Sequence, residues 1–355
     1  MTESGNARFC NNNYFDAATI TASSALSDYP ATNLVSTIRS RLWKPSGIFE
    51  ISASNNKVYI DGSTLTIPVA TYTLATLITA FGIATSQTLS RNALGRFVIT
   101  SGVSCILNLS TTTNAIWDVL GYLGTSDLTD TEFTADERRY STGEWIKVDM
   151  GIAQRADFAA LIAAANTAFS APTAVIKLQG NNLDEWAAPP VDLTMEVSSE
   201  GAFIATPSTT QPCRFWRIFI KDRMNNAISV AVAHVGSAIV LTDTNIAVGF
   251  SRQREDQSQK MFSEAGQLYV DRRPKVMSLS SMAVQFLKED ELVEIEQLFY
   301  DLGNNVPFFL CVDPTKAVSS SLSQMTHYVA VTSDFSLQHV LNSYYNLSFS
   351  LREVL

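Results

Sequence analysis

The chain has 355 residues, of which 46% are hydrophobic and only 17% are charged, and its formal net charge is −9. This acidic balance argues against a nucleic-acid-binding protein, which needs a basic stripe to displace counterions from phosphate. Small neutral polar residues fill the gap left by charged ones, and such a surface loses little hydration when a partner covers it. Composition therefore favours a β-rich structural protein of two or three domains over a cytosolic enzyme.

The four cysteines, Cys10, Cys105, Cys213 and Cys311, lie far apart and form no CxxC pair. We expect them to be reduced and mostly buried thiols. No signal peptide is recognisable before residue 20, and no apolar run reaches the roughly 18 residues that a membrane-spanning helix needs. The sequence therefore predicts no membrane span.

The first segment of the chain, residues 1–17, is polar and carries three consecutive asparagines at 11–13. Polar terminal segments are ordered only when something holds them. We therefore expect an N-terminal arm that a neighbouring molecule orders.

Residues 48–139 predict a compact α+β subdomain. The run KVYIDG at 57–62 ends in Asp-Gly, which indicates a tight hairpin turn. The stretch 74–82 carries apolar residues at helical spacing, with Thr73 as the expected cap and Gly82 as the expected stop. A further strand is expected at 96–102 and a helical turn at 114–124.

Residues 143–240 return to strand patterns, and the stretch RFWRIFIKD at 214–222 is bulky on both faces. One face would carry Trp216, Ile218 and Ile220, and the other Phe215, Arg217 and Phe219. Such a strand is covered on both sides or has one face in an interface.

Residues 246–355 combine short strands with one helix. The segment KEDELVEIEQLFYDLGNN places apolar residues on one side and three acidic residues in the first turn, where the helix dipole favours them, and Gly303 follows as the stop. The closing stretch YYNLSFSLRE alternates, with Tyr345, Leu347, Phe349 and Leu351 expected to point inward.

The sequence offers no catalytic machinery. His234, His327 and His339 share no metal-ligand spacing, and each is expected to be an ordinary strand or turn residue. No nucleotide-binding, nucleophile-elbow or zinc-protease motif occurs. The acidic run at 127–137 lacks a calcium-loop pattern, so we interpret it as a solvated loop. We expect no enzyme activity, no metal and no cofactor.

Several motifs in order resemble the discoidin jelly-roll domain once residues 48–140 are set aside. The pieces are Ser23-Ser24, Tyr29 to Leu34, Arg41-Leu42-Trp43, Trp145 to Gly151, Ala165-Asn166, Val175 to Gly180 and Arg214 to Ile218. The resemblance implies that the two tryptophan stretches around Trp43 and Trp145 belong to one sandwich that an inserted subdomain splits.

The inserted subdomain and the C-terminal part resemble tail proteins of bacteriophages. The insert carries Val58-Tyr59-Ile60, Tyr72 to Leu77 and Phe97 to Ser101, and the last hundred residues are similar to the distal-tail and tail-tube family. The implied fold is mainly β. It has an arm at 1–17, a discontinuous discoidin-like sandwich at 18–47 and 140–240, the insert at 48–139, and a tail-tube-like β domain with one helix at 245–355.

The resemblance implies a virion structural protein of the tail tip or baseplate, assembled in the host cytoplasm, that forms a threefold or sixfold ring. Its partners would be its own copies and tail tube, hub and fibre proteins. The stretch 250–286, with Arg272 and Arg273, and the closing strand, with Tyr345 and Phe349, are candidate ring contacts; the alternative is that they are ordinary core strands.

A second hypothesis is that the sandwich binds host-surface glycan. Its candidate stacking residues are Trp43, Trp186 and Tyr29, although Trp43 and Trp145 are expected to pack in the core. Trp186 lies in the polar loop NNLDEWAAPP and is the best candidate for a surface aromatic. It could equally anchor another tail protein.

Overall fold

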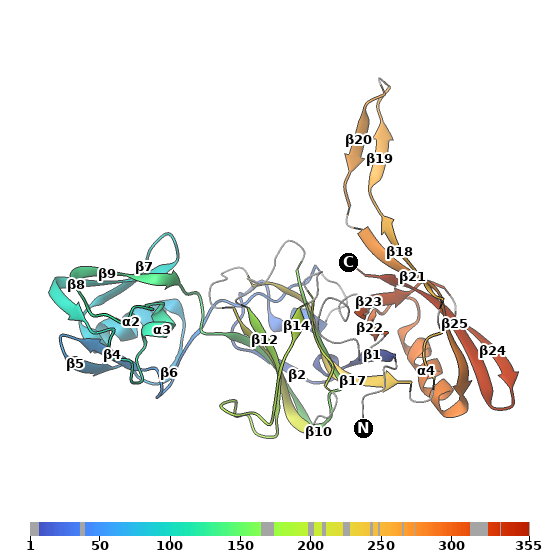
Figure 1. Ribbon diagram of the computed structural model, residues 1–355, viewed down its shortest axis with the longest axis horizontal. Coiled ribbons are helices and arrows are strands. Elements are labelled where there is room, and N and C mark those ends of the chain that lie inside the picture. The colour runs from blue at the N-terminus through green and yellow to red at the C-terminus, as the bar shows by residue number, and fades with distance from the viewer. Residues whose placement is uncertain are drawn as a thin grey trace.

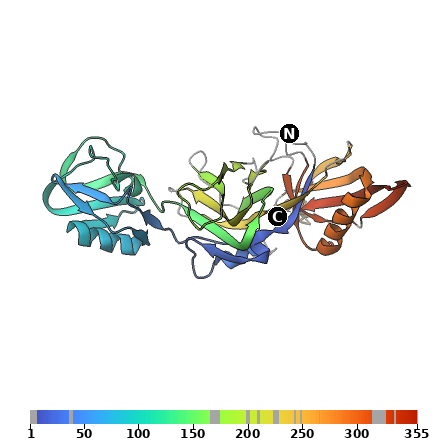
Figure 2. The same ribbon diagram turned by 90° about the horizontal axis from the view of Figure 1, so that it is seen from below.

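The computed structural model describes residues 7–354 apart from 36–39, 165–173, 198–201, 208–210, 223–227, 242–243, 248, 265, 274, 313–325 and 334. The protein is mainly β, with several antiparallel sheets. Three units follow one another along the long axis: the inserted subdomain at one end, the sandwich in the middle and the C-terminal unit at the other end (Figures 1 and 2).

One long antiparallel sheet runs from the sandwich into the C-terminal unit. Its path is β14-β15-β11-β17-β1-β22-β23-β25-β21-β18, and β24 branches from β25. The strands are β14 (Glu196–Val197), β15 (Ala202–Ala205), β11 (Phe158–Ala163), β17 (Val230–Val240), β1 (Arg8–Asn13), β22 (Phe308–Cys311), β23 (Thr326–Val331), β25 (Tyr344–Glu353), β21 (Lys275–Lys288), β18 (Ser251–Asp256) and β24 (Ser336–Leu341).

The expectation of an N-terminal arm is wrong for the described residues 8–13, which form the central strand β1. This strand pairs with β17 on one side and β22 on the other, so it joins the two units through backbone hydrogen bonds. Phe9 is fully buried and packs against Phe308 and Phe349. Asn13, one of the three asparagines that make this segment polar, lies at the end of the strand and caps the short helix α1 (Tyr14–Ala17).

The β1–β17 junction requires a glycine at position 236. A β-carbon on Gly236 would lie 1.7 Å from the backbone carbonyl oxygen of Asn12. A real side chain cannot approach a carbonyl oxygen so closely, so the two strands meet here only because residue 236 has no β-carbon.

The sandwich packs a second, five-stranded sheet against the β11–β17 part of the long sheet. Its strands are β13 (Val191–Thr194), β12 (Val175–Asn181), β16 (Cys213–Lys221), β10 (Glu144–Gln154) and β2 (Thr19–Ala22). Trp43, Ile146, Val148 and Trp216 are fully buried in the shared core, together with residues of β11 and β17. The 3-10 helix η1 (Ala31–Val35) contributes Leu34 to the same core.

The inserted subdomain has a core of its own, built from residues between Phe49 and Ala135. Its elements are β3 (Phe49–Ile51), β4 (Lys57–Ile60), β5 (Ser63–Thr66), β6 (Ala70–Tyr72), α2 (Leu74–Thr85), β7 (Thr88–Arg91), β8 (Arg96–Leu107), α3 (Trp117–Leu120) and β9 (Leu128–Arg138). The predicted acidic loop at 127–137 is mostly the strand β9, which buries Phe133 and Ala135.

Local sequence signals place most of these elements correctly. Asp61 and Gly62 have positive φ angles of 50° and 71° and join β4 to β5, as the Asp-Gly signal predicts. Thr73 forms a capping box with Thr76 at the start of α2. Gly82 does not end that helix, which continues to Thr85 and closes at Ser86 in a left-handed conformation.

The C-terminal unit packs the helix α4 (Glu289–Leu302) against the end of the long sheet. Five helix residues are buried as predicted: Leu292, Ile295, Leu298, Phe299 and Leu302. Phe299 contacts Phe349 of β25 at 5.3 Å between ring centroids. Gly303 follows the helix with a φ of 50°.

A two-stranded hairpin extends away from the C-terminal unit, well beyond the rest of the molecule (Figure 1). It consists of β19 (Gln259–Phe262) and β20 (Leu268–Asp271), which pair only with each other among the described residues. The strands β18 and β21 lead into and out of it.

The four cysteines are free and buried, which confirms the expectation from their spacing. Within the described part of the chain, the longest helices fall short of the length and hydropathy that crossing a membrane requires.

Candidate assembly and partner-binding surfaces

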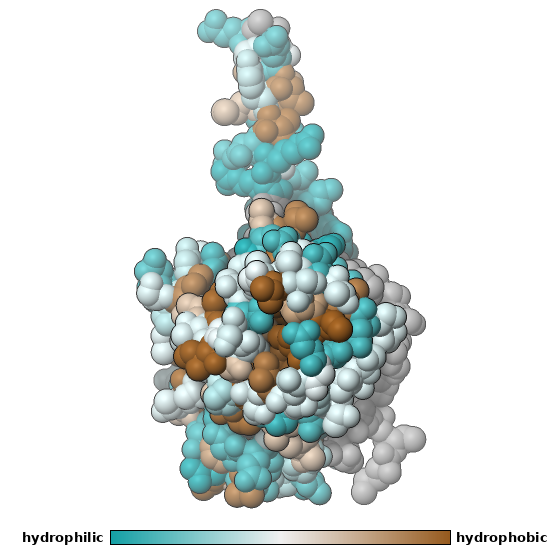
Figure 3. Space-filling model, turned by 90° about the vertical axis from the view of Figure 1, so that its left-hand side faces the viewer, coloured by the Kyte–Doolittle hydropathy of each residue, from teal (hydrophilic) through white to brown (hydrophobic). Residues whose placement is uncertain are grey.

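The projecting hairpin exposes apolar side chains on both of its faces. Phe262 lies opposite Leu268 in the strand register and Met261 lies opposite Tyr269, so each pair occupies one face. The exposed fractions are 73% for Phe262, 63% for Met261 and 56% for Tyr269. Figure 3 shows hydrophobic patches between hydrophilic ones on the projection. A lone two-stranded hairpin is marginally stable in water, and nothing in the described chain covers this one.

The base of the hairpin is charged. Arg272 and Arg273, both predicted as ring contacts, are exposed there, and Arg273 pairs with Asp271 at 3.1 Å. Arg352 of β25 pairs with Glu255 of the edge strand β18 at 3.1 Å. This ion pair links the two strands across β21, which lies between them in the sheet. These exposed ion pairs contribute little to the stability of the fold. The hairpin is therefore a projection with exposed apolar side chains on a charged base.

The body of the C-terminal unit carries a second set of exposed apolar side chains. On α4, Val293 is 61% and Tyr300 is 83% exposed. On the two edge regions of the sheet, Phe286, Val340 and Leu341 are also exposed. The strands β18 and β24 each pair with a single neighbour among the described residues, so they present free edges to solvent.

The closing strand β25 exposes fewer side chains than we expected. Phe349 is only 3% exposed and packs between Phe9 and Phe299, so it is a core residue and its assignment as a ring contact is wrong. Tyr345 is half-buried, packs against the same core and contacts His339 at 5.1 Å between ring centroids. The inward alternation of this strand, in contrast, is confirmed by Leu347, Phe349 and Leu351.

The outer face of the five-stranded sheet carries a row of polar side chains in register. Arg217 on β16 lies opposite Lys147 on β10 and Gln179 on β12. Its Nε donates to the Gln179 Oε1 at 2.6 Å. Although it belongs to the outer face, Arg217 is only 8% exposed, because the loop after β12 folds over it.

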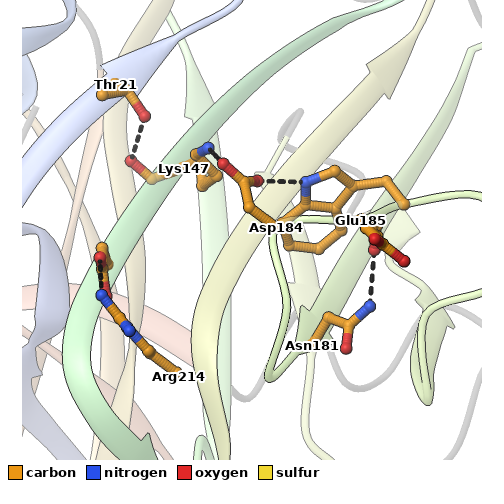
Figure 4. A network of polar contacts seen from close by, with 8 residues as sticks. Thr21, Lys147, Asn181, Asp184, Glu185 and Arg214 are labelled. Atoms are coloured by element: carbon orange, nitrogen blue, oxygen red, sulfur yellow. Dashed lines mark hydrogen bonds and ion pairs between the residues drawn. The ribbon is translucent and has the colours of Figure 1, made fainter.

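Trp186 is the part of that loop that covers Arg217. The Arg217 guanidinium carbon lies 4.1 Å from the Trp186 ring centroid and 5.2 Å from that of Phe219. The Trp186 Nε1 donates to Asp184 at 2.8 Å, and Asp184 pairs with Lys147 (Figure 4). Burial lowers the pKa of Arg217 to about 10, and the nearby carboxylates only partly oppose this. Trp186 is therefore a fixed, half-buried cover, and Arg217 occupies one face of its ring.

A second ion pair stands beside this network, also in Figure 4. Arg214 donates to both carboxylate oxygens of Asp149 at 2.7 Å. The hydrogen bonds from Arg214 and from the Gly151 amide lower the pKa of Asp149 to about 2. The fork geometry orients both groups, but both are exposed, so the pair defines a surface feature more than it stabilises the fold.

Replacing Trp186 by alanine is expected to lower the free energy of unfolding by about 1 to 2 kcal/mol, because a partly desolvated cation–aromatic contact is lost. Trp186→Phe keeps the stacking and loses only the bond to Asp184, so it should retain most of this stability. Urea unfolding of both variants checks the expectation. Equal losses for alanine and phenylalanine would show that the aromatic contact with Arg217 contributes nothing.

The other candidate stacking residues are placed differently. Tyr29 is half-buried, and the Lys44 ammonium lies 4.0 Å from its ring centroid. Trp43 is fully buried and donates from Nε1 to the Ser24 carbonyl at 2.9 Å, as expected of a core residue. Trp145, expected in the core, is half-buried on the outer face near Lys147. The structure brings Trp186 together with Trp145 through Lys147, and it leaves Tyr29 apart.

The described residues hold no group of three or more histidine, cysteine, aspartate or glutamate side chains that could bind a metal ion. His234 lies in β17, is 4% exposed and packs between Phe158 and Phe309. Burial lowers the pKa of His234 to about 3, so its imidazole is neutral.

Fold and surface together define a mainly β protein of three units with a projecting apolar hairpin. No protein-family model matches the chain, and no curated protein matches it. Among solved structures, the lectin domain of lectinolysin in complex with Lewis b antigen is similar to 64% of this chain and 98% of that domain, at 10% sequence identity and a TM-score of 0.30.

Proposed function

We propose that this chain is a structural protein of a tailed-bacteriophage virion, a ring-forming component of the tail tip or baseplate. In this proposal the C-terminal unit forms the ring that continues the tail tube, and the sandwich projects outward to dock fibres. The observation that carries the proposal is the hairpin β19–β20, which exposes a pair of apolar side chains on each of its two faces.

The hairpin and the body of the C-terminal unit are complementary surfaces on one chain. The hairpin is a projection with apolar faces, and the body exposes Val293, Tyr300 and Leu341 together with free sheet edges. The hairpin extends away from its own body (Figure 1), and in this proposal a neighbouring copy supplies the surface that covers it. Contacts between two different surfaces of identical chains are heterologous, and they close into a ring when the rotation permits.

The low charge of the chain supports the same proposal. A surface of small neutral polar groups is covered by partners at little desolvation cost, and the expected contacts would each bury roughly 2,000 Å² or more, as in obligate assemblies. The resemblance of the insert and the C-terminal part to phage tail proteins supplies the biological setting, and the ring order would be three or six.

The location in the virion is tested by electron microscopy of phage particles labelled with an antibody against the purified chain. The proposal expects label at the distal end of the tail. Label on the capsid, or particles that lack the protein altogether, would contradict it.

Glycan binding by the sandwich is a second candidate function, favoured by one observation. The outer face of the five-stranded sheet carries Trp145, Phe215 and Phe219, each half-buried and beside a cationic side chain. Such aromatic faces can stack on a sugar ring. A glycan array probed with the wild type and with Trp145→Ala separates this function from fibre docking, because only a glycan-binding face would lose an array signal.

A further inference from the structure

The two faces of the projecting hairpin differ in charge. Residues that lie opposite each other in the strand register share a face. Lys260 lies opposite Val270 on one face, and Phe262 lies opposite Leu268 on the same face. All four side chains are exposed. We call this face the cationic face, because it combines three apolar side chains with one ammonium group and has no carboxylate within β19 and β20. The opposite face carries Asp271.

Further basic side chains surround the base of the hairpin. The segment 251–275 contains six basic and four acidic residues. Two of the acids already have cationic partners, since Arg273 pairs with Asp271 and Arg352 pairs with Glu255. The six basic residues are all exposed: Arg252, Arg254, Lys260, Arg272, Arg273 and Lys275. The projection therefore offers apolar surface with an excess of positive charge, which is complementary to an acidic partner surface.

The helix α4 presents the opposite combination on its outer face. Six of its fourteen residues are acidic and none is basic. Val293 and Tyr300, which we call the outer pair, are 61% and 83% exposed. A spacing of seven residues places the outer pair on one side of the helix, about 10 Å apart along its axis. Five acidic residues flank the outer pair on both sides at helical spacing: Glu289, Asp290, Glu294, Glu296 and Asp301.

These five flanking carboxylates have no cationic partner among the residues that the structure describes. Asp290 and Glu294 are four residues apart on the helix, and like charges at this spacing repel each other. Exposed apolar side chains rimmed by charged groups are typical of an interaction surface. A cationic partner on this face would cover the outer pair and remove the repulsion between the carboxylates.

We propose that the cationic face of the hairpin docks on the outer face of α4 in a second copy of this chain. In its own chain the hairpin extends away from α4 (Figure 1). Lys260 lies two residues from Phe262, about 7 Å along the strand, and each member of the outer pair has a carboxylate one helical turn away, at about 5 to 6 Å. The apolar groups of both surfaces can therefore touch while their charges pair. The inference rests on the proposed function, because it names the surface that receives the hairpin within the ring.

Charge reversal tests the contact, with the assembly measured by analytical ultracentrifugation. The hairpin variant carries Lys260→Glu and Arg272→Glu. The helix variant carries Glu294→Lys and Asp301→Lys, and all four positions are exposed. Each variant should raise the dissociation constant of the assembly about tenfold or more, because like charges then face each other. A chain with all four substitutions should assemble nearly as the wild type does, since its reversed surfaces match again.

The apolar half of the contact is tested without changing any charge. Val293→Ser together with Tyr300→Ser should also weaken assembly about tenfold. Both side chains lie in water in the free chain, so the melting temperature should stay close to that of the wild type. Unchanged assembly in this variant would overturn the inference.

The outcomes separate this inference from the ring proposal. A matched control reverses Glu132 and Arg138, both exposed on β9 of the insert, and should assemble normally. Normal assembly of the helix variant while the hairpin variant dissociates would overturn the inference and leave the ring standing, because the hairpin would then dock elsewhere. A folded four-substitution chain that stays dissociated would overturn it as well. A monomeric wild type would contradict the ring itself and this contact with it.

Discussion

The double substitution Phe262→Asp and Tyr269→Asp is expected to convert an assembled ring into monomers without unfolding the chain. The two side chains lie on opposite faces of the hairpin, and both are more than half exposed. An aspartate on each face would have to be desolvated wherever a neighbouring subunit covers the hairpin, and burying an unpaired carboxylate is strongly unfavourable. In a free monomer the same side chains stay in water.

Light scattering after size exclusion measures the expected change in mass, and a thermal melt measures the fold. A matched control is Ile83→Asp with Val103→Asp in the inserted subdomain, where the two side chains are 81% and 72% exposed. The control should assemble normally. An assembled hairpin variant, or loss of assembly in both double variants, would show that the hairpin is not the specific contact.

The second large effect is expected at Glu144, whose carboxylate ties three segments together at the base of the insert. It accepts hydrogen bonds from Ser23 and Ser24 before the first linker and from Ile48 after it, while residue 144 itself begins β10. Glu144→Ala removes all three and is expected to lower the free energy of unfolding by about 3 kcal/mol. Glu144→Gln should cost about 1 kcal/mol or less, because both serine hydroxyls can rotate to accept from the amide.

The pH dependence gives an independent check on Glu144. Burial raises the pKa of Glu144, and the bonds from Ser23, Ser24 and Ile48 oppose this only in part. A folded pKa above the unfolded value of about 4.3 means that the native state binds more protons between the two values. The stability contribution is therefore present below the unfolded pKa and is lost as pH rises through the folded pKa. Urea unfolding across this range should show that loss in the wild type and not in Glu144→Gln. Parallel profiles for the two proteins would refute the assignment.

Local signals in the sequence were sufficient to predict many elements of the fold. The Asp-Gly turn, the Thr73 cap, the apolar stripe of α4 and the alternation of β25 each depend on residues a few positions apart. Their physics is short-range, so the chain need not be folded for the pattern to be recognised. The bulky outer face of β16 was predicted either to be covered or to lie in an interface, and Trp186 covers Arg217 there.

The errors concern long-range contacts that a local pattern does not contain. Residues 8–13 read as a polar arm, yet Phe9 and Cys10 are buried because β17 and β22, more than two hundred residues away, pair on either side. Phe349 was assigned to an interface, although α4 and β1 cover it within the same chain. The hydrogen bonds of Glu144 at the insert junction were missed entirely, because Ser23, Ser24 and Ile48 reach its carboxylate only after the chain on both sides of the insert has folded.

The most direct test of the central claim, that copies of this chain cover one another through the hairpin, is the mass of the purified wild-type protein in solution at micromolar concentration. Light scattering should give three or six times the chain mass of 38.8 kDa. A single species at 38.8 kDa that persists as the concentration is raised would contradict the account.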